Sequence, residues 1–162
     1  MARVIILSDS EKQNKGSMQA KDLFCSNFFK NTYKYASLLN PDYIYIITSK
    51  YGIVSQEEII SSYKKDVYSI DKNNLIENNL TFIQDLTNKT NLVEDEFILL
   101  CKERHNKLIV PWLINYSCPF EGLSNRKKIN KLNSIIFEEK MKKIKYKNYK
   151  KVLYLMDTEK VI

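Results

Sequence analysis

The chain has 162 residues, of which 44% are hydrophobic and 12% aromatic, enough to bury one core without disulfides, which excludes a disordered chain. Three cysteines, Cys25, Cys101 and Cys118, are far apart and form no Cys/His cluster, so the spacing predicts reduced thiols, no metal and no cofactor. The short apolar run near the N-terminus predicts neither a signal sequence nor a membrane span, and we expect a cytoplasmic protein without a membrane partner.

The net charge of +7 is concentrated in one segment. Residues 126–151 hold eleven Lys or Arg against two Glu, a local charge of +9, whereas the rest of the chain sums to −2. Clustered positive charge attracts phosphates, which favours a nucleic-acid partner, DNA before RNA. A solvated face in a chain rich in Lys, Asn and Ile is the alternative. The candidate backbone-binding residues are Arg126, Lys127, Lys142, Lys143 and Lys145.

The first half of the chain alternates predicted strands and helices. The β-branched runs at residues 3–7 and 43–48 predict two strands, the first buried on both faces. Between them, residues 18–39 have apolar side chains at helical spacing and predict one long helix or two shorter ones, with Ser17 as the N-cap. After the second strand, residues 57–62 are expected to form a helical turn, and residues 63–70 a loop.

The second half continues the alternation. Residues 72–89 predict a helix, residues 97–101 a third buried strand, and residues 104–116 another helix. A polar turn at 118–122, a basic helix at 124–144 and a last strand at 152–156 follow. Strands alternating with helices predict a single α/β domain over residues 1–162, with a mainly parallel central sheet covered on both faces.

Polar residues follow each predicted strand, where the carboxyl ends of parallel strands form a crevice that binds ligands in such folds. They are Ser8, Asp9, Ser10 and Lys12 after the first strand, Ser49, Lys50, Tyr51 and Gly52 after the second, and Lys102, Glu103 and His105 after the third. Loops after buried strands are polar in any case. No Walker glycines, no Gly-x-Gly-x-x-Gly after the first strand and no serine elbow are present, which argues against ordinary nucleotide folds and triad hydrolases.

Asp9, Lys50 and Tyr51 are the candidate catalytic residues. A carboxylate among lysines stays ionised and can act as a base or stabilise a cationic transition state, although Asp9 can equally be a capping residue. His105, the single histidine, is a candidate general base or a structural residue. Gly52 is expected to adopt a positive φ, and Tyr63 and Tyr68 can stack on a base or sugar, or simply pack.

Several motifs resemble a family of small bacterial and phage domains of unknown function. Ser8-Asp9-Ser10-Glu11-Lys12 is similar to its Ser-Cys-x-x-Lys element, and Ala20 to Ser26 with Phe29 to its Ala-x-Asp-Leu-Tyr-x-Ser-x-x-Phe element. Ser49-Lys50-Tyr51-Gly52 resembles the most specific block, and Tyr63 a downstream tyrosine. Pro119 to Leu123 resembles a Pro-Leu-x-Gly-Leu turn. The likeness covers about residues 3–135.

The resemblance implies a three-layer Rossmann-like fold similar to uracil-DNA glycosylase and to the peroxide-stress YaaA proteins, with an association with deazaguanine modification of nucleic acids and phage conflict. It adds Glu121, Gly122 and Asn125 to the expected substrate-binding residues. Two departures matter. The family's cysteine is Asp9 here, which excludes a thiol role at that position, and its glycines are replaced by Asn125 and Arg126.

Two classes of function are expected, and a third is a weaker alternative. The first is a nucleic-acid enzyme that acts on a base or its glycosidic bond, like a DNA glycosylase, because the lysines can bind phosphates while Asp9 stabilises positive charge on the sugar. The second is a non-catalytic module that binds nucleic acid or protein. The third is a hydrolase of a free nucleotide or nucleoside.

Overall fold

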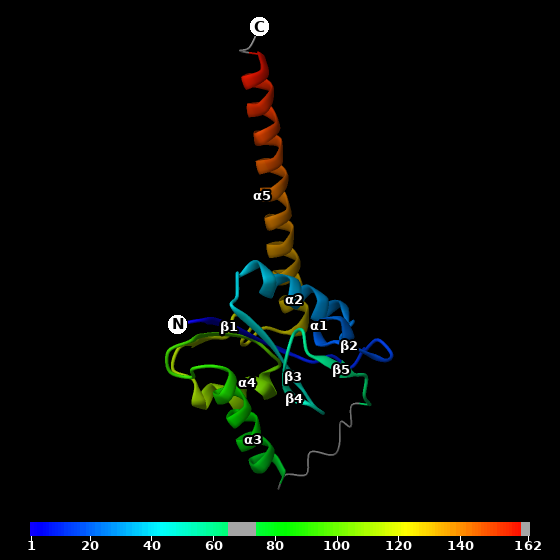
Figure 1. Cartoon of the computed structure of the whole chain (residues 1–162), viewed down its shortest axis with the longest axis vertical. Coiled ribbons are helices and arrows are strands. Elements are labelled where there is room, and N and C mark those ends of the chain that lie inside the picture. Colours follow the sequence, from blue (N-terminus) through cyan, green and yellow to red (C-terminus); the bar gives the residue numbers. More distant parts are fainter. Residues whose placement is uncertain (65–73, 160–162) are drawn as a thin grey trace. The chain divides into compact units, whose positions relative to one another are not determined.

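The computed structural model describes residues 1–64 and 74–159 (Figure 1). The chain divides into two compact units, Met1–Leu123 and Ser124–Ile162. The first unit contains all the strands of the described chain, and in the second the structure describes one helix, α5 (Asn125–Glu159). The basic helix predicted from residue 124 is therefore confirmed, and it continues well beyond residue 144.

The described part of the first unit contains a five-stranded sheet with the order β4-β3-β1-β6-β7. The central strand β1 (Arg3–Ser8) is parallel to β3 (Tyr43–Thr48) on one side and to β6 (Glu96–Leu100) on the other. At the edges, β7 (Tyr116–Ser117) is parallel to β6, and β4 (Gly52–Ser55) is antiparallel to β3. The predicted α/β class with a mainly parallel sheet is confirmed.

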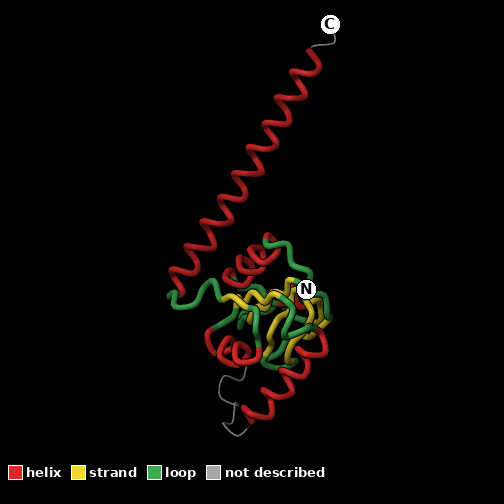
Figure 2. The backbone as a smooth tube through the Cα atoms, turned by 90° about the vertical axis from the view of Figure 1, so that its left-hand side faces the viewer, coloured by secondary structure: helices red, strands yellow, loops and turns green. Residues whose placement is uncertain are grey.

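Helices lie on both sides of this sheet (Figure 2). Helices α1 (Ala20–Leu23) and α2 (Asn27–Leu38) lie on one side, and α3 (Asn74–Lys89) and α4 (Glu103–Ile109) on the other. Side chains of β1 alternate between the two: Val4 and Ile6 pack in a core cluster with Leu86 of α3 and Ile109 of α4. Because both faces are covered, each central strand contains a continuous apolar run, residues 4–7 in β1 and 97–100 in β6, as their sequences predicted.

The segment between β1 and β3 differs from the prediction. Strand β2 (Ser17–Gln19) pairs antiparallel with β5 (Ile59–Ser61), so the helical turn expected at residues 57–62 and the N-cap expected at Ser17 are wrong. The N-cap of α2 is Ser26, whose hydroxyl accepts a hydrogen bond of 3.1 Å from the backbone N–H of Phe29. Pairing with a distant segment overrides the local helical spacing here.

Two predictions near the C-terminus also need correction. The helix expected at 104–116 ends at Ile109 and continues only as a 3-10 turn, Val110–Trp112, because Pro111 lacks a backbone N–H. The strand expected at 152–156 is wrong, since α5 runs through it to Glu159 with no Gly or Pro to end it. The expected loop at 63–70 lies largely outside the described residues, as does Tyr68. None of the described helices is long and apolar enough to cross a membrane.

Candidate functional site

The carboxylate of Asp9 lies where the loops after β1 and β3 meet. Its side chain is fully buried, at 0% exposed. Oδ2 accepts hydrogen bonds from the hydroxyl of Tyr63 at 2.8 Å, and from the backbone N–H and the hydroxyl of Ser49 at 3.2 and 3.3 Å. The backbone N–H of Asp9 donates to the carbonyl of Ile47 at 2.9 Å. These bonds join residues that are up to 54 positions apart in the sequence.

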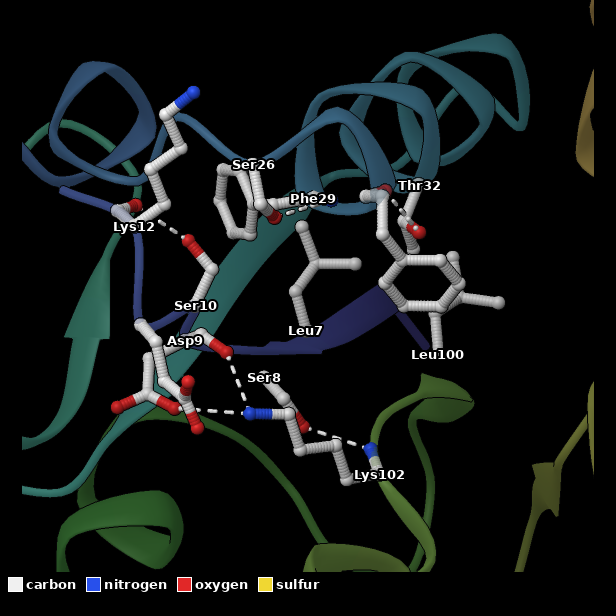
Figure 3. A pocket seen from close by; sticks show the side chains of 12 residues that line it. Leu7, Ser8, Asp9, Ser10, Lys12, Ser26, Phe29, Thr32, Leu100 and Lys102 are labelled. Atoms are coloured by element: carbon white, nitrogen blue, oxygen red, sulfur yellow. Dashed lines mark hydrogen bonds and ion pairs between the residues drawn. The ribbon is translucent and has the colours of Figure 1, made fainter. Parts of the chain in front are cut away.

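Lys102 brings the loop after β6 to the same place (Figure 3). Its ammonium donates to the carbonyl of Asp9 at 3.0 Å and lies 3.7 Å from the carboxylate atom Oδ1. Its side chain is 38% exposed, so the charge stays in contact with solvent. Donors from two segments and this cation all face the carboxylate.

Ser8 and His105 hold the loop after β6, which carries Lys102. The backbone N–H of Lys102 donates to the hydroxyl of Ser8 at 2.8 Å, and that oxygen lies 2.7 Å from Nδ1 of His105. His105 is buried, and it is absent from the described residues that line the cavity at this end of the sheet. The pair therefore holds the turn that carries Lys102, and general-base catalysis by His105 stays a prediction.

An aromatic cluster connects Tyr51 and Lys50 to Asp9. The ring of Tyr63 makes edge-to-face contacts with Tyr51 and Phe24, with centroid distances of 5.6 and 6.5 Å. The ammonium of Lys50 lies 5.1 Å from the centroid of Tyr51. Burial, and then the charge of Asp9, raise the pKa of Tyr63, so its hydroxyl remains a hydrogen-bond donor at neutral pH.

A cavity of about 370 Å³ opens beside Asp9, where the ends of β1 and β6 face the start of α2. Strand β1 is the point at which the strand order reverses, because the chain proceeds to β3 on one side of it and later to β6 on the other. Open α/β sheets bind ligands at this point. The lining residues are Leu7, Ser8, Asp9, Ser10, Glu11, Lys12, Ser26, Phe28, Phe29, Thr32, Leu100 and Lys102.

Comparison with known proteins places the chain in a family. A family model described as a family of unknown function (DUF6884) matches residues 4–134, most of the chain. The chain belongs to this family. The resemblance to domains of unknown function is thereby confirmed. No curated protein and no solved structure matches the chain.

The DUF6884 match covers the whole sheet of the first unit and the start of α5, and it ends before the most basic part of that helix. All three glycines lie in the matched region and have a positive φ. Gly16 has φ of 98°, whereas Gly52, the first residue of β4, and Gly122, before α5, have φ of 70°. The expectation for Gly52 is confirmed, and a residue with a Cβ would be strained at any of these positions.

Other predicted residues lie elsewhere. Glu121 and Gly122 belong to the turn that follows Cys118, while Asn125, Arg126 and Lys127 form the first turn of α5. Lys142, Lys143 and Lys145 lie further along α5. Glu121 and Gly122, which belong to the first unit, are not among the described residues that line the cavity.

The start of α2 supplies cavity residues that the sequence interpretation missed. Ser26, Phe28, Phe29 and Thr32 line the cavity from this helix. The available signal was Ser26, a polar N-cap residue two positions before the pair Phe28-Phe29, because it marks a helix start. Among the described residues, no group of three or more His, Cys, Asp or Glu is arranged to hold a metal ion.

Proposed function

We propose that this protein binds a nucleotide of a nucleic acid in the cavity beside Asp9 and acts on its base or its glycosidic bond, as a DNA glycosylase does. The observation that carries the proposal is a cavity at the reversal point of the strand order that has Asp9 among its lining residues. The family resemblance implies a fold similar to uracil-DNA glycosylase and an association with deazaguanine modification, which supports the same proposal. We place the activity in phage–host conflict as part of this proposal. DNA is the expected partner before RNA.

The cavity lining fits a flat heterocycle that carries a phosphate. Leu7, Phe28, Phe29 and Leu100 offer apolar and aromatic surface for a base, and the cavity volume lies within the usual range for small-molecule sites, about 300–1,000 Å³. Lys12 and Lys102 offer positive charge for a phosphate. A base held in this way must leave the stack of the nucleic acid.

Asp9 suits the chemistry of glycosidic bond cleavage. When the bond between C1′ and the base nitrogen breaks, the electron pair leaves with the base and positive charge develops on the sugar. A carboxylate held in a fixed position stabilises that charge, and it can accept the proton of the water that adds to C1′. Tyr63 and Ser49 fix the carboxylate through Oδ2, and Lys102 lies nearest to Oδ1.

The second candidate is binding without catalysis, and the complete burial of Asp9 favours it. A carboxylate at 0% exposure, held by Tyr63, Ser49 and Lys102, can serve to join three loops and nothing more. In that case the cavity holds a nucleotide and the chain acts as a recognition module. The two candidates differ in what happens when the carboxylate becomes an amide.

The test is mass spectrometry of bases released from modified and unmodified DNA and RNA. We expect release by the wild-type protein and none by Asp9→Asn, with oligonucleotide binding preserved. Asp42→Asn is the matched control, because Asp42 accepts a hydrogen bond from the backbone N–H of Arg3, at the start of β1 rather than at its end. Release by Asp9→Asn at the wild-type rate, or no release from any substrate, would overturn the enzymatic proposal. Release from free nucleosides that DNA does not inhibit would point to a nucleoside hydrolase.

A further inference from the structure

The most basic part of α5 is a run of lysines with no acidic residue among them. Residues 140–151 contain seven lysines and no acidic residue. Every one of these residues is exposed. Lys142 forms an ion pair of 2.7 Å with Glu139, just outside the segment, but both partners lie at the surface, where such pairs contribute little. Lysines three or four residues apart on a helix repel one another, so an anionic partner that reduces this repulsion stabilises the helical segment.

The charge density of this segment matches that of a nucleic-acid strand. Twelve helical residues extend over about 18 Å, which gives roughly one positive charge per 2.6 Å. One strand of DNA carries a phosphate about every 3.4 Å. A second copy of the chain is a poor partner for the same reason, since seven lysines would face seven lysines.

One face of the helix combines lysines with aromatic rings. Lys142, Lys145, Tyr146 and Tyr149 are spaced i, i+3, i+4 and i+7, which places them on a single face. Both tyrosines are 62% exposed, and the ammonium of Lys150 lies 5.2 Å from the ring centroid of Tyr146. Cations and rings share this face and are not segregated into a polar and an apolar side, as they are in helices that lie in a membrane surface.

We infer that this face of α5 binds single-stranded nucleic acid, with Lys142 and Lys145 at phosphates and Tyr146 and Tyr149 stacked on unpaired bases. Stacking selects single strands, because the flat faces of bases are covered in a duplex. The inference goes beyond the proposed function, since binding by α5 requires no chemistry at Asp9. The face also lies outside residues 4–134, the segment that the family model matches.

The test measures binding of the full chain to a fluorescein-labelled single-stranded oligonucleotide, to its duplex, and to vesicles of phosphatidylserine and phosphatidylcholine, by fluorescence anisotropy or co-sedimentation at several salt concentrations. We expect the single strand to bind most tightly. Replacing Tyr146 or Tyr149 by Ala should weaken that binding roughly 5- to 100-fold while leaving the salt dependence unchanged. Phe137→Ala is the matched control, because Phe137 is 63% exposed on the same helix and lies about two and a half turns before Tyr146, on the opposite face.

Charge reversal gives an independent measurement. Lys142→Glu with Lys145→Glu should reduce the slope of log K against log salt by about 1.4, the value for two phosphate contacts to a single strand. Lys30→Glu with Lys34→Glu on α2 makes the same change in net charge at exposed positions and should leave the slope near the wild-type value.

Three results would overturn the inference: binding to the duplex as tight as to the single strand, binding to vesicles without binding to oligonucleotide, or tyrosine variants that behave like Phe137→Ala. Oligonucleotide binding without base release removes the proposed enzyme and leaves this inference standing. Base release combined with tyrosine variants that behave like Phe137→Ala supports the enzyme and removes this inference.

Discussion

The polar cluster around Asp9 and the lysine segment of α5 differ in how far their charged groups are buried and in the partners that the chain itself provides for them. Asp9 is buried and its charge is matched within the chain by hydroxyl and backbone donors and by Lys102. Residues 140–151 are exposed, and their seven positive charges have no acidic residue among them. The first arrangement stabilises the fold whether or not a ligand is present, whereas the second acts only on a partner. We therefore expect substitutions around Asp9 to lower the free energy of unfolding much more than substitutions in the lysine segment.

The largest effect is expected at Asp9. Asp9→Ala leaves the hydroxyl of Tyr63 without the acceptor it uses and removes the carboxylate that faces Lys102. We expect the free energy of unfolding to fall by about 3 kcal/mol in urea denaturation, because several hydrogen bonds to a buried charge are lost together. Asp9→Asn should lose less, since the amide oxygen can still accept from Tyr63 and Ser49. A loss below about 1 kcal/mol for Asp9→Ala would contradict the role of Asp9 in joining the loops.

Much of this cluster followed from the sequence. Continuous β-branched runs identified β1 and β3, and the rule that parallel strands end on the same edge brought Asp9, Ser49 and Lys102 together. The direction of individual side chains did not follow. Ser8 lines the cavity, so its expected role in substrate binding stays a prediction, but the sequence did not show that its hydroxyl also accepts from the backbone N–H of Lys102 and faces His105.

Short elements that depend on distant partners were not predictable. Strands β2 and β5 have three residues each, too few for periodicity to show, and each forms only because the other is present. The start of α2 at Ser26 was not located for a related reason, because the apolar residues on both sides of it fitted one long helix as well as two shorter ones.

A smaller effect is expected at Tyr63. Tyr63→Phe removes the hydroxyl that donates to Asp9 and should lower the free energy of unfolding by about 1.5–2 kcal/mol at neutral pH. Because the pKa of Tyr63 is raised above the ordinary value of 10.0, its contribution is present below pH 10 and is lost as the pH rises above it. The difference between wild type and variant should therefore shrink at alkaline pH. Tyr51→Phe is the control, since its hydroxyl donates at an exposed position to Ser61; an equal loss there would argue against a special role for Tyr63.

Asp95 offers a second buried carboxylate, one that faces backbone donors. Hydrogen bonds from the backbone N–H groups of Ala2 and Asn91, at 2.7 and 2.9 Å, lower the pKa of Asp95 below its usual 3.8. Its contribution is present above the unfolded pKa and is lost as the pH falls through the lower folded value. Asp95→Asn should lower stability by about 1 kcal/mol at pH 7. The deficit should narrow in urea denaturation below about pH 4, and a deficit that persists in acid would show that packing causes it.

The smallest effect on stability is expected in α5. Lys143→Ala or Lys147→Ala should change the free energy of unfolding by less than about 0.5 kcal/mol, with a slight gain where repulsion between lysines is relieved. Thermal unfolding followed by circular dichroism measures this directly. A loss above about 1 kcal/mol would mean that these lysines have partners within the chain and that the contrast between the two regions does not hold.

The backbone bond from Asp9 to Ile47 has a consequence for engineering and for divergence. This bond extends the β1–β3 ladder by one residue, so the register of the two strands determines where Asp9 lies. A slip of one residue would move Asp9 by about 3.3 Å and turn it to the opposite side of the sheet. Core substitutions that change the register of β1 and β3 would therefore displace Asp9 and abolish the site. Loop substitutions would change only the residues around Asp9 and leave its position in place.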